Sequence, residues 1–298
     1  MQTESQSSLV SSPHNPIAQP PDTTVAEPVV QPIALPPQTA ENPAWTGWDV
    51  LRIFILGIAG IFTSATILLF AAHGANLQQR SEYLAARPEF LLLAQMVVYA
   101  GLLAYMYVLV VYERHQPRFW QSIGWNFPRK YWPYILGGIV MQIVFLLIAR
   151  FLPFPEETPF QDLLRKPSSL AIIGVFSVSF GPLMEELFFR GFLYPVIVRR
   201  VELFARRFND GVTARNAGIY TGIFITAITF ALIHGSQYAY SWASLLLICI
   251  VGMVLGTVRA LRGSVGASFV VHASYNSAIM ILVGFATGGF RHLELLSH

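Results

Sequence analysis

Seven long apolar runs dominate the sequence and limit the folds that are open to it. They lie near residues 49–72, 89–112, 132–152, 169–198, 217–237, 243–260 and 264–286. A helix needs about 20 apolar residues to cross a bilayer, and several such runs are hard to bury in one soluble core. Charged residues make up only 12% of the chain, against about 25% in soluble domains. The sequence therefore predicts an all-α fold, a multi-pass transmembrane helical bundle of about seven membrane helices.

The start of the chain has a different composition from the rest. Residues 1–44 contain nine prolines, many Ser, Thr and Gln, and neither Lys nor Arg. Such a segment cannot bury enough apolar surface to offset its loss of conformational entropy. It also lacks the basic start and continuous apolar core of a signal peptide. We expect a disordered proline-rich tail over 1–46 and a membrane-embedded domain over 47–290.

Basic residues between the runs predict the orientation of the chain. One side, together with the N-terminus, would hold Arg114, Arg118, Arg129, Lys130, Arg199, Arg200, Arg206, Arg207, Arg215, Arg259 and Arg262. The other side would hold Arg80, Arg87, Arg165, Lys166 and Arg291. Cytoplasmic loops are richer in Lys and Arg, so we expect a cytoplasmic N-terminus, in the plasma membrane of a bacterium. No basic cluster with interleaved aromatic residues points to nucleic acid as a partner.

Three charged residues stand near the middle of the fourth run. An ionisable side chain at membrane depth costs at least about 2.5–3.5 kcal/mol and persists where it is paired or functional. Glu186 and Arg190 are four residues apart and are expected to form an ion pair. Glu185 is offset by about 100° and is expected to face a cavity as a candidate general base, the alternative being a purely structural Glu–Arg clasp. Gly181 and Pro182 are expected to loosen or kink the helix just before the pair.

Two histidines and an asparagine lie in later runs. His234 in the fifth run could equally be a neutral histidine that is hydrogen-bonded to a neighbouring helix. In the seventh run His272 and Asn276 are four residues apart, so their side chains share one face. Hydrogen bonding between helices is their alternative role. Taken together, a carboxylate, two imidazoles and an amide can activate a water and stabilise a tetrahedral oxyanion.

Three short motifs connect these residues to a known family. They read Glu185-Glu186-x-x-x-Arg190, Phe230-x-x-x-His234 and His272-x-x-x-Asn276. Their order and spacing resemble those of the CPBP family, the CAAX-protease and bacteriocin-processing (Abi) intramembrane endopeptidases. The resemblance covers roughly residues 90–286, with a motif-bearing catalytic core at 169–286. It implies a cavity between the motif-bearing helices and hydrolysis of a peptide bond in a peptide or lipidated protein within membrane lipid.

The resemblance also implies a role for each motif residue. Glu185 would be the general base, and His234 would position or activate the water. His272 and Asn276 would stabilise the oxyanion, while the second glutamate and the arginine would hold the site together. Family members are described as metalloproteases, so Glu185, His234 and His272 are also candidate ligands of a zinc ion. The chain has no His-Glu-x-x-His motif, and because a metal-free glutamate mechanism fits the same residues, we favour it.

Two other functions fit the same pattern. A non-catalytic membrane scaffold or a bacteriocin-immunity protein could share the fold, because a fold does not fix a function. A transporter with a proton relay is disfavoured, since transporters usually carry internal repeats and none is visible in the sequence.

The predicted helix boundaries leave one geometric mismatch. At about 1.5 Å per residue, His234 lies about 25 Å from the predicted cytoplasmic start of its helix, and His272 about 12 Å from its own. Both can flank Glu185 only if the fifth helix protrudes from the membrane or the seventh starts earlier.

Overall fold

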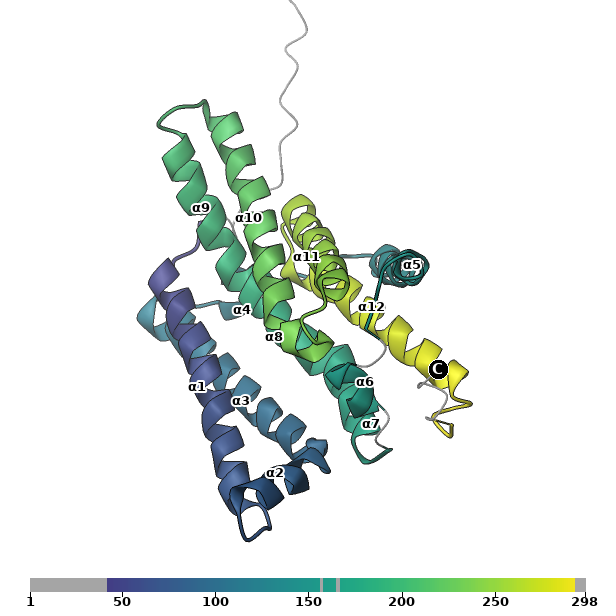
Figure 1. The fold of residues 1–298 in the computed structure, drawn as a ribbon. Coiled ribbons are helices and arrows are strands. Elements are labelled where there is room, and N and C mark those ends of the chain that lie inside the picture. Colours follow the sequence, from purple (N-terminus) through teal and green to yellow (C-terminus); the bar gives the residue numbers. More distant parts are fainter. Residues whose placement is uncertain (1–41, 156–157, 165–166, 293–298) are drawn as a thin grey trace, which may run out of the picture. The chain divides into compact units, whose positions relative to one another are not determined.

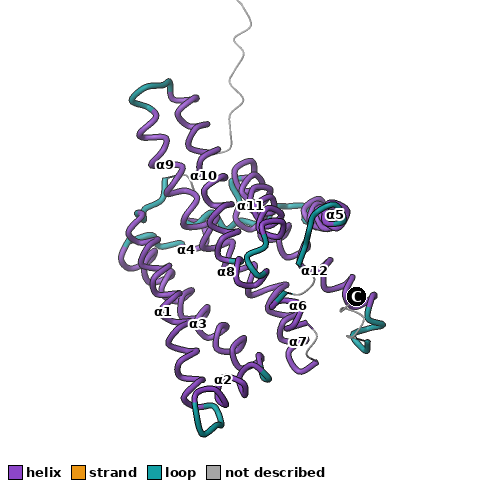
Figure 2. Tube along the Cα trace, viewed as in Figure 1, coloured by secondary structure: helices purple, strands orange, loops and turns teal. Residues whose placement is uncertain are grey.

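The seven apolar runs form seven long helices in the computed structural model, which describes residues 42–155, 158–164 and 167–292. These helices are Gly47–Ala71, Pro88–Glu113, Trp132–Ala149, Leu170–Ala205, Gly211–Ile233, Trp242–Arg262 and Val265–Ala286. Each is long and apolar enough to cross a membrane. Figure 2 shows helices and loops but no strand in the described part of the chain. The predicted all-α fold with seven membrane helices is therefore confirmed.

Several spans are divided into shorter elements, of which the α-helices are labelled in Figure 1. The first three spans and their connections comprise α1 (Gly47–Ala71), α2 (Leu77–Ala85), α3 (Pro88–Val108), η1 (Leu109–Glu113), α4 (Phe119–Ser122), α5 (Trp132–Ala149) and α6 (Pro159–Leu164). The fourth span comprises α7 (Pro167–Val175), η2 (Phe176–Phe180), α8 (Gly181–Glu186), η3 (Leu187–Leu193) and α9 (Tyr194–Ala205). The remaining elements are α10 (Gly211–Ile233), η4 (Gly235–Tyr238), α11 (Trp242–Arg262) and α12 (Val265–Ala286).

The fourth span contains two π-helical turns, η2 and η3, on either side of α8. Each turn ends within two residues of a proline, Pro182 and Pro195 respectively. Proline has no N–H to donate to the preceding turn, and wide π-turns occur where the α-helical hydrogen-bond ladder is interrupted. The loosening predicted at Gly181 and Pro182 takes this form. As a result α8, with its two glutamates, sits between two irregular turns.

The same span is the centre of packing in the membrane domain. Its Met184, Leu187 and Phe192 join a buried apolar cluster with side chains from α1, η1 and α4. Its Phe189 joins a second buried cluster with side chains from α5, α10, α11 and α12. Because lipid is as apolar as these side chains, close van der Waals packing holds such helices together. The fourth span is thereby fixed from both sides.

Close packing also requires glycine at two helix crossings. A Cβ added to Gly252 of α11 would lie 2.9 Å from the Cα of Ala227 in α10. A Cβ added to Gly138 of α5 would collide with the carbonyl oxygen of Val271 in α12. Only glycine allows two helix backbones to approach this closely.

Two boundaries of the sequence prediction are wrong, and their correction removes the mismatch in depth. The fourth span continues to Ala205 rather than ending near 198, and the fifth begins at Gly211 rather than near 217. Figure 1 shows α9 and α10 extending together beyond the ends of the neighbouring helices. The seventh helix begins at Val265, close to its predicted start. The extra length lies at the protruding start of α10, which is why His234, at the other end of this helix, can lie beside Glu185.

The end of the predicted tail packs against the membrane domain. Trp45 is buried, and its Nε1 donates a hydrogen bond to the carbonyl oxygen of Phe192 at 3.1 Å. The two rings lie 4.8 Å apart between centroids. Residues 1–41 lie outside the described residues, so the disordered tail and the boundaries of the membrane domain stay predictions.

Candidate active site

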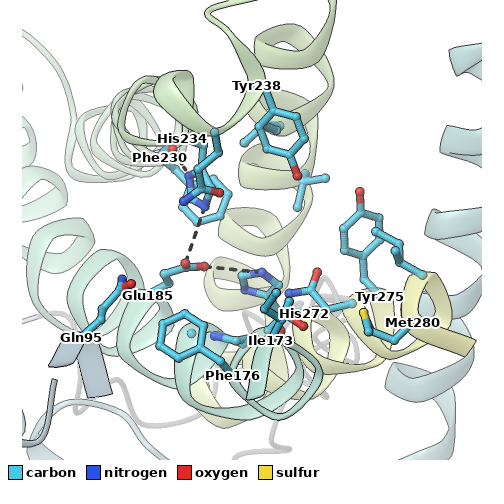
Figure 3. Close-up of a pocket in the computed structure, with 18 of the residues that line it drawn as sticks. Gln95, Ile173, Phe176, Glu185, Phe230, His234, Tyr238, His272, Tyr275 and Met280 are labelled. Atoms are coloured by element: carbon cyan, nitrogen blue, oxygen red, sulfur yellow. Dashed lines mark hydrogen bonds and ion pairs between the residues drawn. The ribbon is translucent and has the colours of Figure 1, made fainter. Parts of the chain in front are cut away.

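Glu185 of α8 faces a cavity of about 250 Å³ and lies between two histidines (Figure 3). Its Oε1 is 3.5 Å from Nε2 of His234, and its Oε2 is 3.6 Å from Nε2 of His272. The three residues come from α8, the end of α10 and α12, which are far apart in the sequence. The structure thus brings together the carboxylate and the two imidazoles that the motifs singled out.

His234 is the residue that follows the last turn of α10. Its Nδ1 lies 2.7 Å from the carbonyl oxygen of Phe230, four residues earlier. A carbonyl oxygen only accepts hydrogen bonds, so Nδ1 carries the proton in this contact. The ring is also 4.5 Å from the Phe230 ring between centroids. These contacts hold the imidazole with Nε2 directed at Glu185.

A fully buried ionic network orients His272. Glu186 accepts a hydrogen bond from Nδ1 of His272 at 2.9 Å and forms the predicted ion pair with Nη1 of Arg190, also at 2.9 Å. The other oxygen of Glu186 accepts a hydrogen bond from Ser268. Arg190 in turn donates from Nη2 to the carbonyl oxygen of Gly252 at 3.0 Å. Because the paired carboxylate accepts from Nδ1, the Nε2 of His272 is left to face Glu185.

The hydrogen bonds therefore fix which ring nitrogen of each histidine faces Glu185. Both imidazoles carry a proton on Nδ1 and direct Nε2 at the same carboxylate. If both were neutral and Glu185 were ionised, two nitrogen lone pairs would face a negative charge without a proton between them. A proton held by one of the three groups, or a water that donates between them, would satisfy these lone pairs.

Asn276 lines the same cavity one turn beyond His272 on α12. Its Nδ2 donates a hydrogen bond to the carbonyl oxygen of Ser177 at 2.7 Å. Ser177 belongs to the π-helical turn η2, in which the backbone hydrogen bonds are rearranged. The amide is thus held in place by the irregular turn that precedes α8.

Several polar residues of the site were not singled out from the sequence. Ser268 binds Glu186, and Gln95 donates a hydrogen bond to the hydroxyl of Tyr99 at 3.0 Å beside the cavity. Tyr238 and Tyr275 also line the cavity. Neutral polar side chains are common in membrane helices, so they give a weak signal. Ser268 alone could have been found, because it lies four residues before His272 on the same helix face.

Glu185, His234 and His272 are the residues that could hold a metal ion. Carboxylate and imidazole suit zinc, and the Nδ1 atom of each histidine has a partner, as is usual for zinc-binding histidines. Within the described ranges, however, no three His, Cys, Asp or Glu side chains are gathered closely enough to hold a metal ion. The catalytic steps proposed below therefore use only the side chains of this chain, and metal dependence stays a prediction to be tested.

These features define an integral membrane protein with a carboxylate and two imidazoles enclosed by its helices. Residues 167–278 match the family model of the type II CAAX prenyl endopeptidase Rce1-like proteins. The chain therefore carries an Rce1-like domain of the CPBP family, and the resemblance seen in the motifs is confirmed. At the level of the family, this domain is that of a CAAX-type intramembrane protease. No curated protein and no solved structure matches the chain.

Proposed function

We propose that the chain is an intramembrane endopeptidase in which Glu185 is the general base that activates water. The observation that supports this most directly is the position of the Glu185 carboxylate, which faces a cavity between His234 and His272. A positioned base beside neighbouring proton donors and acceptors is the arrangement that general acid–base catalysis requires. The substrate would be a membrane-associated protein cleaved near its terminus, as the CAAX type of the domain suggests.

In the proposed mechanism the three groups share one proton, and each residue of the cluster has a distinct task. With that proton on Nε2 of His272, Glu185 is ionised and His272 is a charged hydrogen-bond donor. A water can then donate one proton to Glu185 and the other to the unprotonated Nε2 of His234, which orients its oxygen. Glu185 removes a proton as the water oxygen attacks the carbonyl carbon of the scissile peptide bond.

The tetrahedral intermediate then needs donors for its oxyanion and a proton for its leaving group. His272 donates from Nε2, and the Asn276 amide supplies a second donor beside it. Glu185 passes the proton taken from water to the peptide nitrogen, the C–N bond breaks, and an amine and a carboxylic acid leave. No residue changes its net protonation over one turnover, so the site is ready for the next substrate.

The location of the chain is part of the same proposal. The membrane spans are long enough to cross a bilayer, and the segments richer in Lys and Arg lie on the side where α1 begins. By the positive-inside rule that side is cytoplasmic. We assign the chain to the plasma membrane of a bacterium, with its N-terminal side in the cytoplasm.

The decisive test is the substitution Glu185→Gln in the full chain, reconstituted in liposomes with a membrane-anchored peptide substrate. The glutamine amide matches the carboxyl in shape and can donate to either imidazole, so the helices should stay packed while cleavage is lost. Retained cleavage would remove Glu185 as the base. Cleavage should also survive a chelator, whereas loss that zinc restores would assign a metal to the site. Partner capture without cleavage, unaffected by Glu185→Gln, would favour a scaffold or immunity protein.

A further inference from the structure

The cavity at Glu185 extends toward only one end of the helical bundle. Its lining beyond the catalytic cluster comes from the start of α3, the start of the fourth span, the start of α11 and the end of α12. Pro159, Gln237 and Tyr238, which lie in the connections at that end, complete the lining. All these helix ends meet the described segments 72–87, 150–155 and 234–241. We call this the cavity end of the bundle.

The opposite direction from Glu185 is closed by tightly packed side chains. Side chains on that side are completely buried, with no exposed surface: Glu186, Leu187, Arg190, Phe192, Leu255 and Ser268. They come from α8, η3, α11 and α12, so they close the bundle across its width. Interiors packed in this way admit no peptide without a large rearrangement. A substrate therefore reaches Glu185 from the cavity end.

At the cavity end, α10 ends early and is followed by a short turn. Helix α10 stops at Ile233, level with Glu185, although it extends beyond its neighbours at its other end (Figure 1). The short turn η4 takes its place, and Tyr238 of this turn points over the catalytic cluster in Figure 3. The turn η4 is in contact with the short helix α6, and both supply residues to the cavity lining.

The basic residues lie mainly at the other end. The connections 114–131 and 206–210, together with the last turn of α11, hold Arg114, Arg118, Arg129, Lys130, Arg206, Arg207, Arg259 and Arg262. At the cavity end the described connections hold Arg80, Arg87, Arg150 and Arg291, while Arg165 and Lys166 lie outside the described residues. Arg199, Arg200 and Arg215, on the extended parts of α9 and α10, add to the excess at the basic end. The positive-inside rule therefore places the cavity end outside the cytoplasm.

We infer that the site takes its substrate from the extracytoplasmic side of the membrane. The inference rests on the proposed peptidase function and adds the class of substrate to it. Among the described lining residues, Glu185 is the only Asp, Glu, Lys or Arg, and the rest are apolar, aromatic or neutral polar side chains and the two histidines. An unpaired charge is costly in such a cavity. The substrate is thus an uncharged stretch of peptide that enters from outside the cytoplasm.

Cysteine labelling tests on which side of the membrane the cavity end lies, and it does not require an active protein. The single native cysteine is replaced by Cys249→Ala, and Gln237→Cys at the mouth of the cavity is compared with Asn209→Cys at the tip of the α9–α10 pair. Gln237 and Asn209 are both exposed. A membrane-impermeant maleimide should label the Gln237→Cys protein in spheroplasts and the Asn209→Cys protein only in inverted vesicles. The reverse pattern, or labelling of either site from both sides, would overturn the inference.

A second measurement separates this inference from the peptidase proposal. A bulky impermeant maleimide added from outside should reduce cleavage by the Gln237→Cys protein at least tenfold relative to the same protein unlabelled. The same reagent on the Asn209→Cys protein in inverted vesicles should leave cleavage unchanged. Correct labelling without any peptide cleavage would refute the enzyme while leaving the orientation intact. Cleavage that persists after complete labelling at Gln237→Cys would overturn the route.

Discussion

Gly137 and Gly138 of α5 provide a matched pair for testing how tightly the site is held. A Cβ on Gly138 would meet the carbonyl oxygen of Val271, Cβ of Ser274 at 2.8 Å and the backbone nitrogen of Tyr275 at 2.9 Å. A Cβ on Gly137 would meet nothing within 4 Å. The substitutions Gly138→Ala and Gly137→Ala therefore add the same methyl group to the same helix, but only the first presses on α12.

The size of the effect follows from these distances. Ordinary carbon contacts are about 3.5–4.0 Å, so α12 must move by roughly 0.7 Å beside His272. Overpacking of this kind costs about 1–3 kcal/mol, of which up to about 1 kcal/mol is offset by the better helix propensity of alanine. A misplacement of about 1 Å can reduce catalysis about 100-fold. We expect Gly138→Ala to lower kcat about 10- to 100-fold and to lower the Tm.

The assay compares the two variants with the unchanged protein in one detergent. Thermal unfolding gives the Tm, and cleavage of one membrane-anchored peptide gives kcat. Gly137→Ala should match the unchanged protein or have a slightly higher Tm, because alanine favours the helix. If Gly138→Ala were as stable and active as Gly137→Ala, α5 would not pack against the backbone of α12, and the positioning of His272 by this crossing would be refuted.

Two further predictions concern stability. Glu186→Ala should lower the free energy of unfolding by about 3–5 kcal/mol, because it leaves Arg190 buried without a counter-charge. Ser268→Ala removes one hydrogen bond to Glu186 and should lower it by only about 1–3 kcal/mol. Denaturant unfolding measures both values, and a larger loss for Ser268→Ala than for Glu186→Ala would contradict the network. Hydrogen bonds from the backbone and side chain of Thr213 hold the pKa of Asp210 below its usual value at the start of α10. That cap contributes fully at neutral pH and is lost as the pH falls through the lowered pKa of Asp210. Amide hydrogen exchange in the first turn of α10 should therefore become faster as the pH falls through that pKa. The Asp210→Asn variant should not show this change.

Most of the fold was predictable because the bilayer restricts the length and composition of every membrane-spanning helix. A span must be apolar over about 20 residues, and that length alone located all seven helices. The errors fall where another constraint decides the outcome. The extended parts of α9 and α10 leave the apolar runs and support each other as a pair of helices. The hydropathy of a segment does not reveal such contacts between helices, so the helix ends at Ala205 and Gly211 were not predicted.

The residues of the site were predictable for a related reason. Charge is so costly within lipid that each buried ionisable residue must have a partner or a function. From the sequence alone, this argument identifies Glu185, Glu186, Arg190, His234 and His272. It could not find Tyr99 or Tyr238, because a tyrosine buries most of its surface at little cost and is common in membrane helices. Their place in the cavity depends on helix rotation, which the sequence pattern does not fix.

The two adjacent glutamates show what the structure adds to the motif. Glu185 and Glu186 have the same side chain and are adjacent in the sequence. The sequence distinguishes them only because Glu186, and not Glu185, lies four residues before Arg190. The structure separates them by their surroundings: Glu186 is fully buried, with Arg190, Ser268 and His272 as partners, while Glu185 faces the cavity. The Glu186 carboxylate accepts a hydrogen bond from Nδ1 of His272, which directs the Nε2 of His272 at Glu185. The second glutamate therefore holds and orients His272, while the first is the one that can contact a water in the cavity.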